Sequence, residues 1–203
     1  MLLSTPMTEA AEFTEPLTVD AATGLVAPCR QVPSPNCDER PLGVEPELFV
    51  IHCISLPPGE YSNGYVAALF TNGLDPTAHP YFESIADLTV SAHFFIARTG
   101  VLTQFVPVTQ RAWHAGQSQY CGRTACNDFS VGIELEGTDS SPFAAAQYRS
   151  LNALVSVLRD AIPSLAAGNA VGHSDIAPGR KSDPGSEFNW SDARALHRVS
   201  ASP

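Results

Sequence analysis

The sequence predicts a single α/β domain in which helices cover a mixed central β-sheet. Two apolar runs, at residues 48–54 and 129–137, have the length and the β-branched content of strands. Residues 142–161 carry the three- and four-residue apolar spacing of an amphipathic helix. Strands and helices intermix along the chain without strict alternation, which favours a mixed sheet. With 203 residues, of which 44% are apolar, the chain can bury one sizeable core.

The chain is expected to begin with a flexible leader, residues 1–19, in front of a domain that spans residues 20–203. Met7 offers an alternative start to Met1 within that leader. Residues 29–46 are rich in Pro, Asn and Asp and are predicted to run over the surface as a loop.

The first apolar run, residues 48–54, ends before Pro57-Pro58-Gly59 and is typical of a buried strand. In the second run, alternate residues from Phe129 to Leu135 are apolar, while Glu134 and Glu136 share the opposite face. One face of this strand should therefore pack against helices, and the other should look into a polar, wet space.

The helix predicted at residues 142–161 has Ser141 as its N-cap and Pro142 in its first turn, and Pro163 ends its pattern. The remaining elements predicted from turn residues and apolar spacing are a short helix at 65–70, a β-hairpin with strands at 90–97 and 101–106, a strand at 170–173 that opens a loop at 174–185, and a closing helix at 191–199.

Composition excludes several classes of function. The formal net charge is −10 and the 11 Lys and Arg residues are scattered, so neither nucleic acid nor an anionic membrane is an expected partner. No stretch approaches the 18 to 20 apolar residues of a membrane span, and residues 1–16 do not have the pattern of a secretory signal. We therefore expect a cytoplasmic protein, and its five cysteines are expected to be free thiols.

Two histidines stand where a metal site would form. His52 lies on a predicted strand, and His173 ends another strand and opens the polar loop at 174–185. A catalytic zinc takes three protein ligands and leaves a fourth position open. That loop offers Asp175 or Asp183 as the third ligand; Asp175 is typical of a turn or helix cap, and Asp183 is favoured because Pro184 follows it directly.

Amide hydrolysis at such a metal also needs a base and a group that stabilises the oxyanion. Glu134 is the candidate base, although a solvent-facing strand glutamate would look the same in sequence. Lys181 is the candidate for the second group, with a solvated loop lysine as the ordinary alternative. Trp113 and His114 are interpreted as a substrate-binding wall near the metal, with a core or loop aromatic pair as the ordinary alternative. Cys53 cannot pair with His52 as a thiol nucleophile, because neighbouring strand residues point to opposite faces.

Several local strings resemble one family, in the same order and over about residues 20–198. The strings are Val50-Ile-His-Cys-Ile-Ser-Leu-Pro-Pro-Gly59, Val90-Ser-Ala-His93, Arg111-Ala-Trp-His-Ala-Gly116, Cys126-Asn-Asp-Phe-Ser130, Gly132-Ile-Glu-Leu-Glu-Gly-Thr-Asp139 and Gly172-His-Ser-Asp-Ile-Ala-Pro-Gly-Arg-Lys-Ser-Asp-Pro-Gly185. The chain is similar to the zinc N-acetylmuramoyl-L-alanine amidases of the AmpD type.

This resemblance implies the mixed α/β fold that these amidases share with peptidoglycan-recognition proteins. It also implies Zn²⁺ held by His52, His173 and Asp183, with Glu134 as the catalytic glutamate and Lys181 as the lysine that supports the transition state. The implied reaction is cleavage of 1,6-anhydro-muropeptides between the lactyl group and L-alanine. It belongs to cell-wall recycling, and through its substrates it affects β-lactamase induction indirectly. A monomer is expected.

The chain departs from the family pattern at three positions. Cys53 stands where the family usually has Asn, Thr89 where a basic residue is expected, and Ala125 where some members have Arg. Arginines at the last two positions would suit stem-peptide carboxylates, so the preferred peptide length is left open. Two other functions stay open at this point: a muropeptide-binding module without turnover, and an exported amidase that acts on intact cell wall.

Overall fold

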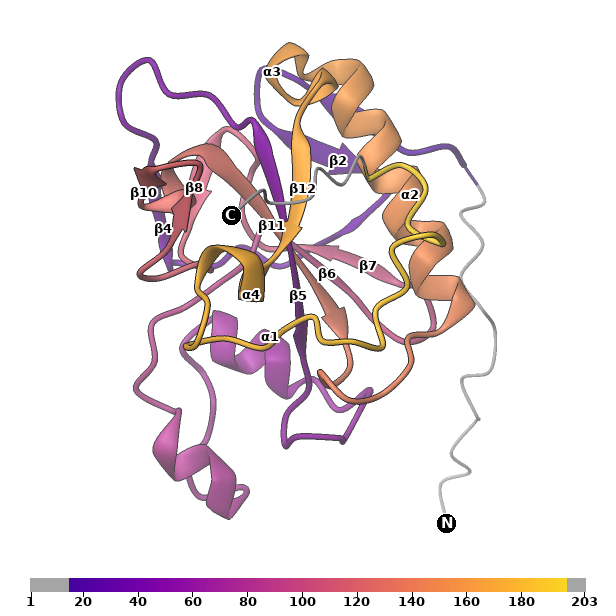
Figure 1. Cartoon of the computed structure of the whole chain (residues 1–203). Coiled ribbons are helices and arrows are strands. Elements are labelled where there is room, and N and C mark those ends of the chain that lie inside the picture. Colours follow the sequence, from indigo (N-terminus) through magenta and orange to yellow (C-terminus); the bar gives the residue numbers. More distant parts are fainter. Residues whose placement is uncertain (1–14, 197–203) are drawn as a thin grey trace.

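A six-stranded mixed β-sheet forms the centre of the molecule, and the computed structural model describes residues 15–196 (Figure 1). The elements along the chain are β1 (Thr18–Asp20), β2 (Leu25–Ala27), β3 (Arg30–Gln31), β4 (Cys37–Glu39), β5 (Leu48–Ile54), α1 (Tyr65–Phe70), the 3-10 helix η1 (Pro80–Ser84), β6 (Phe94–Ile96), β7 (Leu102–Gln104), β8 (Gln110–Ala112), β9 (Gln119–Tyr120), β10 (Arg123–Thr124), the 3-10 helix η2 (Cys126–Phe129), β11 (Ser130–Glu136), α2 (Ala145–Ala161), α3 (Pro163–Ala166), β12 (Asn169–Gly172) and α4 (His173–Ile176).

The strand order in the sheet is β12-β5-β11-β6-β7-β3. The first four of these strands run parallel, β7 is antiparallel to β6, and β3 is parallel to β7. The predicted fold class, a mixed sheet covered by helices, is therefore confirmed, as is the hairpin, although its strands are only three residues long.

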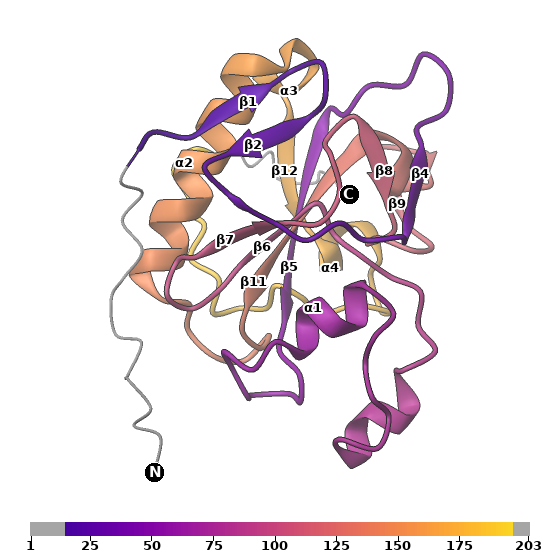
Figure 2. The same cartoon turned by 180° about the vertical axis from the view of Figure 1, so that it is seen from behind.

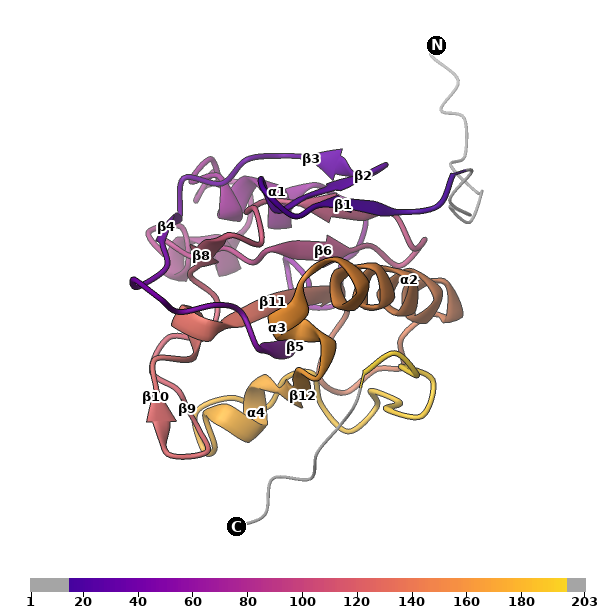
Figure 3. The ribbon, with the colours of Figure 1, turned by 90° about the horizontal axis from the view of Figure 1, so that it is seen from above.

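Helix α2 covers one face of the sheet, and β4, β8 and β10 lie on the other side when the molecule is viewed from above (Figure 3). The apolar face of β11, Val131, Ile133 and Leu135, packs in one buried cluster with Leu151 and Leu154 of α2. Full burial of a side chain of this size contributes about 1.5–3 kcal/mol, so this interface is a major source of stability. The apolar face predicted for β11 is confirmed, but its other face is buried as well and does not open to water along its length.

The opposite face of the sheet carries a second core beneath α1. Val66, Leu69 and Phe70 of α1 are buried there with Leu56 and Phe105. The hairpin of β1 and β2 lies beside α2 and is best seen from behind (Figure 2). No helix within residues 15–196 is both long and apolar enough to cross a lipid bilayer.

Four predicted elements differ from the structure. The loop predicted at residues 174–185 begins inside helix α4, and His173, predicted as the end of a strand, is the first residue of that helix. Helix α2 begins at Ala145 rather than at residue 142, because the backbone N–H of its N-cap, Ala144, donates to the Gln147 side chain at 2.9 Å. Residues 29–46, predicted as loop, contain the two short strands β3 and β4. Residues 191–196 form turns instead of the closing helix, whose last part, residues 197–199, lies outside the described residues.

The boundary predicted between leader and domain falls inside a strand. Leu17 is buried at 6% exposure, and Thr18–Asp20 pair with Leu25–Ala27, so the folded part already includes residues 17–19. The alternative starts, Met1 and Met7, lie outside the described residues.

Candidate active site

Three parallel strands bring their carboxyl ends together at the site. His52 lies on β5 and Glu134 on β11, and the two residues are direct partners in the parallel register. His173 follows β12 and begins α4. Side chains on such paired positions point to the same face, which here is the face opposite α2. Ligands of α/β sheets bind at this end of the strands.

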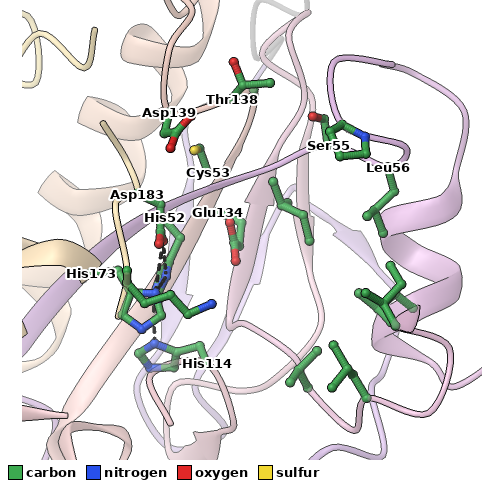
Figure 4. A pocket seen from close by; sticks show the side chains of 18 of the residues that line it. His52, Cys53, Ser55, Leu56, His114, Glu134, Thr138, Asp139, His173 and Asp183 are labelled. Carbon is green, nitrogen blue, oxygen red and sulfur yellow. Dashed lines mark hydrogen bonds and ion pairs between the residues drawn. The ribbon is translucent and has the colours of Figure 1, made fainter. Parts of the chain in front are cut away.

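The loop after α4 returns Asp183 to the two histidines (Figure 4). The backbone N–H of Ser174 donates to the Asp183 carbonyl at 2.9 Å, which fixes the return of the loop. The Nδ1 atoms of His52 and His173 lie 3.0 Å apart, and each lies 3.0 Å from Oδ2 of Asp183. The sequence-predicted triad is therefore assembled, and both histidines are buried, at 1% and 3% exposure.

The chemistry of this triad fits a metal ion. The Nε2 atom of His173 lies 3.2 Å from the Ala115 carbonyl, which can only accept a hydrogen bond. When Nε2 carries the proton and donates it to this carbonyl, the lone pair of Nδ1 faces the carboxylate of Asp183, 3.0 Å away. Among residues 15–196, these three residues form the one His/Cys/Asp/Glu group with metal-ligand spacing. A cation bound to the three inward-facing atoms would relieve their mutual repulsion.

Burial keeps His52 in the state that a metal ligand needs. Removal from water lowers the pKa of His52 to about 4, although the neighbouring Asp183 carboxylate acts in the opposite direction. At neutral pH the imidazole is therefore uncharged and has a free lone pair.

Glu134 presents a carboxylate oxygen to the same space. The residue is 9% exposed, and within the described part of the chain its Oε2 has no hydrogen-bond partner. Burial, and then the charge of Asp183, raise the pKa of Glu134 well above its usual value, while Lys181 lowers it. A buried polar atom without a partner is costly, which points to a role with a bound molecule.

A cleft of about 520 Å³ opens over these residues. Its lining combines polar residues, among them His52, Glu134, Lys181 and Asp183, with apolar or aromatic residues, of which Tyr81 and Leu88 are 40% and 48% exposed. A cleft lined by both polar and apolar side chains suits a substrate with both polar and apolar parts.

Residues 42–186 match a protein-family model described as N-acetylmuramoyl-L-alanine amidase. The chain belongs to this amidase family. It is 53% identical over 173 residues to the 1,6-anhydro-N-acetylmuramyl-L-alanine amidase AmpD of Citrobacter freundii, which covers 85% of this chain and 92% of that protein.

Two solved structures place the amidase among known folds. The crystal structure of a Se-Met AmpD derivative has a TM-score of 0.84 and 51% identity, and covers 88% of this chain and 98% of that chain. The complex of AmiD from Escherichia coli with anhydro-N-acetylmuramic acid-L-Ala-D-gamma-Glu-L-Lys has a TM-score of 0.51 and 29% identity, and covers 80% and 62%.

The other predicted site residues of the amidase lie in different places. Lys181 is exposed and lines the cleft. Trp113 is not among the residues that line the cleft, and its indole N–H donates to Asp38 Oδ1 at 3.1 Å. Asp175, the alternative third ligand, accepts a hydrogen bond from the Gly172 N–H at 2.8 Å, as expected of a residue that caps a helix.

His114 lines the cleft but is also part of a group of histidines. Its Nδ1 lies 2.9 Å from His52 Nε2. Removal from water, and then the nearby His52, His93 and His173, hold the pKa of His114 well below its usual value, so its ring is neutral.

The sequence reasoning missed several residues that hold the amidase site. Asn127 and Ser130 contact the segment around His114. Glu136, buried at 4% exposure, accepts the backbone N–H groups of Ser62 and Arg98 at 2.5 and 2.9 Å and so fixes a loop beside the cleft. Asn127 and Ser130 belong to a family string, Cys126-Asn-Asp-Phe-Ser130, so the resemblance contained their signal although no role followed from it.

Proposed function

We propose that this amidase cleaves the amide bond between the lactyl group of 1,6-anhydro-N-acetylmuramic acid and the L-alanine of muropeptides, with Zn²⁺ as cofactor. The observation that carries the proposal is the buried His52–His173–Asp183 triad with the unpartnered Glu134 carboxylate beside it, at the mouth of one cleft. The 53% identity to an anhydro-muramyl amidase, which extends over most of both chains, supports this substrate class.

Zinc suits the triad because nitrogen and carboxylate oxygen are its usual ligands and a catalytic site uses three of them. His52, His173 and Asp183 would hold the ion. When bound, it would supply Lewis-acid polarisation of the scissile carbonyl and of the attacking water.

The protein's own residues would handle the proton and the developing charge. Glu134 would accept the proton of the attacking water and pass it to the alanine nitrogen as the C–N bond breaks. Its raised pKa suits a group that first takes up and then releases a proton. Lys181, whose charge already acts on Glu134 and His52, would stabilise the oxyanion by electrostatic attraction.

The residues that line the cleft would bind the parts of the substrate on either side of the scissile amide. The apolar and aromatic lining residues, such as Tyr81 and Leu88, would contact sugar or alanine methyl groups, and the polar lining residues would bind the amide. Substrate binding by a related amidase is represented by the AmiD complex, whose ligand is an anhydro-muramyl tripeptide.

The test is mass spectrometry of an anhydro-muropeptide digest by zinc-loaded protein, run beside chelator-treated protein. We expect free stem peptide and anhydro-sugar in the zinc sample alone. Cleavage in both samples would refute the metal requirement. Tight binding without turnover in either sample would favour a binding module on the amidase fold.

We further propose that the enzyme acts as a monomer in the cytoplasm, in cell-wall recycling, and that loss of its activity raises β-lactamase expression by letting its substrates accumulate. Cell fractionation tests the location, and recovery in the periplasm would favour an exported amidase. For the regulatory role, a deletion strain is complemented with the wild type or with Glu134→Gln. Only the wild type should restore low β-lactamase expression.

A further inference from the structure

The side chain of His114 lies between a proposed metal ligand and the start of β11 (Figure 4). Its Nδ1 is 2.9 Å from Nε2 of His52, and its own Nε2 is 3.2 Å from Oγ of Ser130. Ser130 is fully buried and its hydroxyl lies 2.5 Å from the Cys126 carbonyl. These contacts form one continuous row of hydrogen bonds from His52 to Cys126.

The direction of each hydrogen bond in this row follows from its last member. The Cys126 carbonyl can only accept, so Ser130 donates its hydroxyl proton to it. Ser130 Oγ therefore accepts from His114 Nε2–H. In a neutral His114 ring, Nδ1 then has no proton and must accept from His52 Nε2–H. The Nδ1 lone pair of His52 is left facing His173 and Asp183.

Ala115, the next residue in the chain, contacts the outer nitrogen of the second histidine, His173. The Ala115 carbonyl lies 3.2 Å from His173 Nε2 and is the nearer partner of that nitrogen, so it accepts the Nε2–H; Arg180 Nη2 donates to the same carbonyl at 2.7 Å and lies farther from Nε2, at 3.5 Å. The Nδ1 lone pair of His173 therefore faces the same point. Two consecutive residues, His114 through its side chain and Ala115 through its carbonyl, thus contact the outer nitrogens of both histidines.

This short segment is itself held in place. Asn127 Oδ1 accepts the backbone N–H groups of both His114 and Ala115, at 3.1 and 2.7 Å. Beneath the ring, Gly132 leaves the space that the imidazole needs, because a Cβ there would lie 2.4 Å from His114 Cγ. The ring therefore lies directly on the backbone of β11.

We propose that the His114–Ala115 segment fixes the tautomers of both histidine ligands, and that His114 is a positioning residue of the metal centre rather than part of a substrate wall. The inference rests on the proposed metal site. Fixing both rings before the ion arrives removes the reorganisation that binding would otherwise require. Outer partners of metal-bound histidines typically contribute about 10–100-fold in metal affinity.

Three variants test the proposal by zinc affinity, measured in competition with a chelating dye. His114→Leu removes the acceptor, and we expect affinity to fall about 10–100-fold. His114→Asn places an amide oxygen near the position of Nδ1, so most of the affinity should return. His93→Asn is the matched control: His93 is also buried and touches the His114 ring edge-on, with centroids 5.8 Å apart, but it makes no hydrogen bond in the row, and an Asn can still accept the Gly132 N–H that its Nδ1 accepts at 3.0 Å. Its zinc affinity should equal that of the wild type.

A second measurement needs no variant and no metal. Long-range ¹H–¹⁵N correlation spectra of the zinc-free wild type at neutral pH report which ring nitrogen carries the proton. We expect Nε2–H tautomers for both His52 and His173. A proton on Nδ1 of either ring, or exchange between the two tautomers, would overturn the inference whatever the variants do.

The two levels of the proposal fail in different ways. If the wild type bound no zinc, the proposed function would fail and the inference with it. If the wild type bound zinc and His114→Leu bound it equally tightly, only the inference would fail. Equal losses in His114→Leu and His93→Asn would also refute it, because they would indicate a general packing defect.

Discussion

Glu134 differs from the other buried carboxylate on its strand. Glu136 accepts two backbone N–H groups, whereas Glu134 Oε2 has no partner within the described residues. The two glutamates share one face of β11, so the sequence pattern alone does not separate them. Their surroundings distinguish them. Both carboxylate oxygens of Glu136 accept hydrogen bonds from the loops that it anchors, whereas Glu134 is directed at the cleft and is free to exchange a proton.

Glu134→Gln should therefore keep zinc and lose most turnover. Removal of a general base typically costs about 10²–10⁴-fold in rate, and the amide keeps the size of the side chain. Initial rates and metal analysis on the same preparation check this. Activity near that of the wild type would remove Glu134 from the mechanism.

The choice between the two loop aspartates can be tested by a matched pair of variants. Asp183→Asn should lose tight zinc binding, because it removes the charged oxygen that lies 3.0 Å from both histidines. Asp175→Asn should keep zinc, since its amide oxygen can still accept the Gly172 N–H. Metal content after dialysis distinguishes them, and the reverse result would make Asp175 the ligand.

At the scale of elements, the sequence predicted those strands and helices whose ends carry strong signals. Strand β5 and helix α1 have the predicted bounds, because a continuous apolar run, Pro57-Pro58-Gly59 and Asn72-Gly73 mark their limits. Strands β3 and β4 have two and three residues, which is too short for an alternating pattern to appear. Their pairing depends on distant partners that no local window contains.

The candidate site, too, could be predicted from the sequence only in part. The triad, Glu134 and Lys181 could be proposed because their residue types and strand-end positions suggest metal chemistry, and the resemblance supported them. The contact between His114 and His52 could not be derived, because it joins residues 62 positions apart. Trp113, predicted with its neighbour as a substrate wall, donates its indole N–H to Asp38 and is not among the residues that line the cleft, and its role stays a prediction.

Strand β11 is tightly matched to the ring that lies on it, which gives a prediction at this scale. Gly132→Ala should displace His114, lower zinc affinity, and cost about 1–3 kcal/mol of stability through overpacking. Gly73→Ala is the control, since a Cβ there would meet no atom closer than 3.8 Å. Denaturant unfolding and dye competition check both, and equal behaviour of the two variants would contradict the close packing.

For the whole molecule, the buried histidines make stability depend on pH. Burial, and then Arg40, lower the pKa of His93 to about 3, and burial lowers that of His52 to about 4. The unfolded chain takes up these protons near pH 6.5, so the stability from neutral burial is fully present above about pH 6.5 and is lost as pH falls through the folded-state values. Glu134 has a raised pKa and acts in the opposite direction.

Comparison of the wild type with a His93 variant isolates the contribution of His93 to this pH dependence. In zinc-free protein, the free energy of unfolding should fall between about pH 6.5 and 4, and His93→Asn should show a shallower fall, by an amount on the order of a few kcal/mol. Urea unfolding at several pH values gives both curves. Parallel curves would show that His93 does not take up a proton on unfolding.

The pairing of His52 with Glu134 across two central strands has a consequence for how such enzymes diverge. Neighbouring strands lie about 4.8 Å apart whatever their sequence, so the sheet fixes the backbone spacing between the proposed metal ligand and the proposed base. Thr89 and Ala125, which depart from the family pattern, lie outside this pair, in segments that connect the helices and strands. Substitutions in those segments therefore leave the spacing between His52 and Glu134 unchanged, because that spacing depends on the two strands alone.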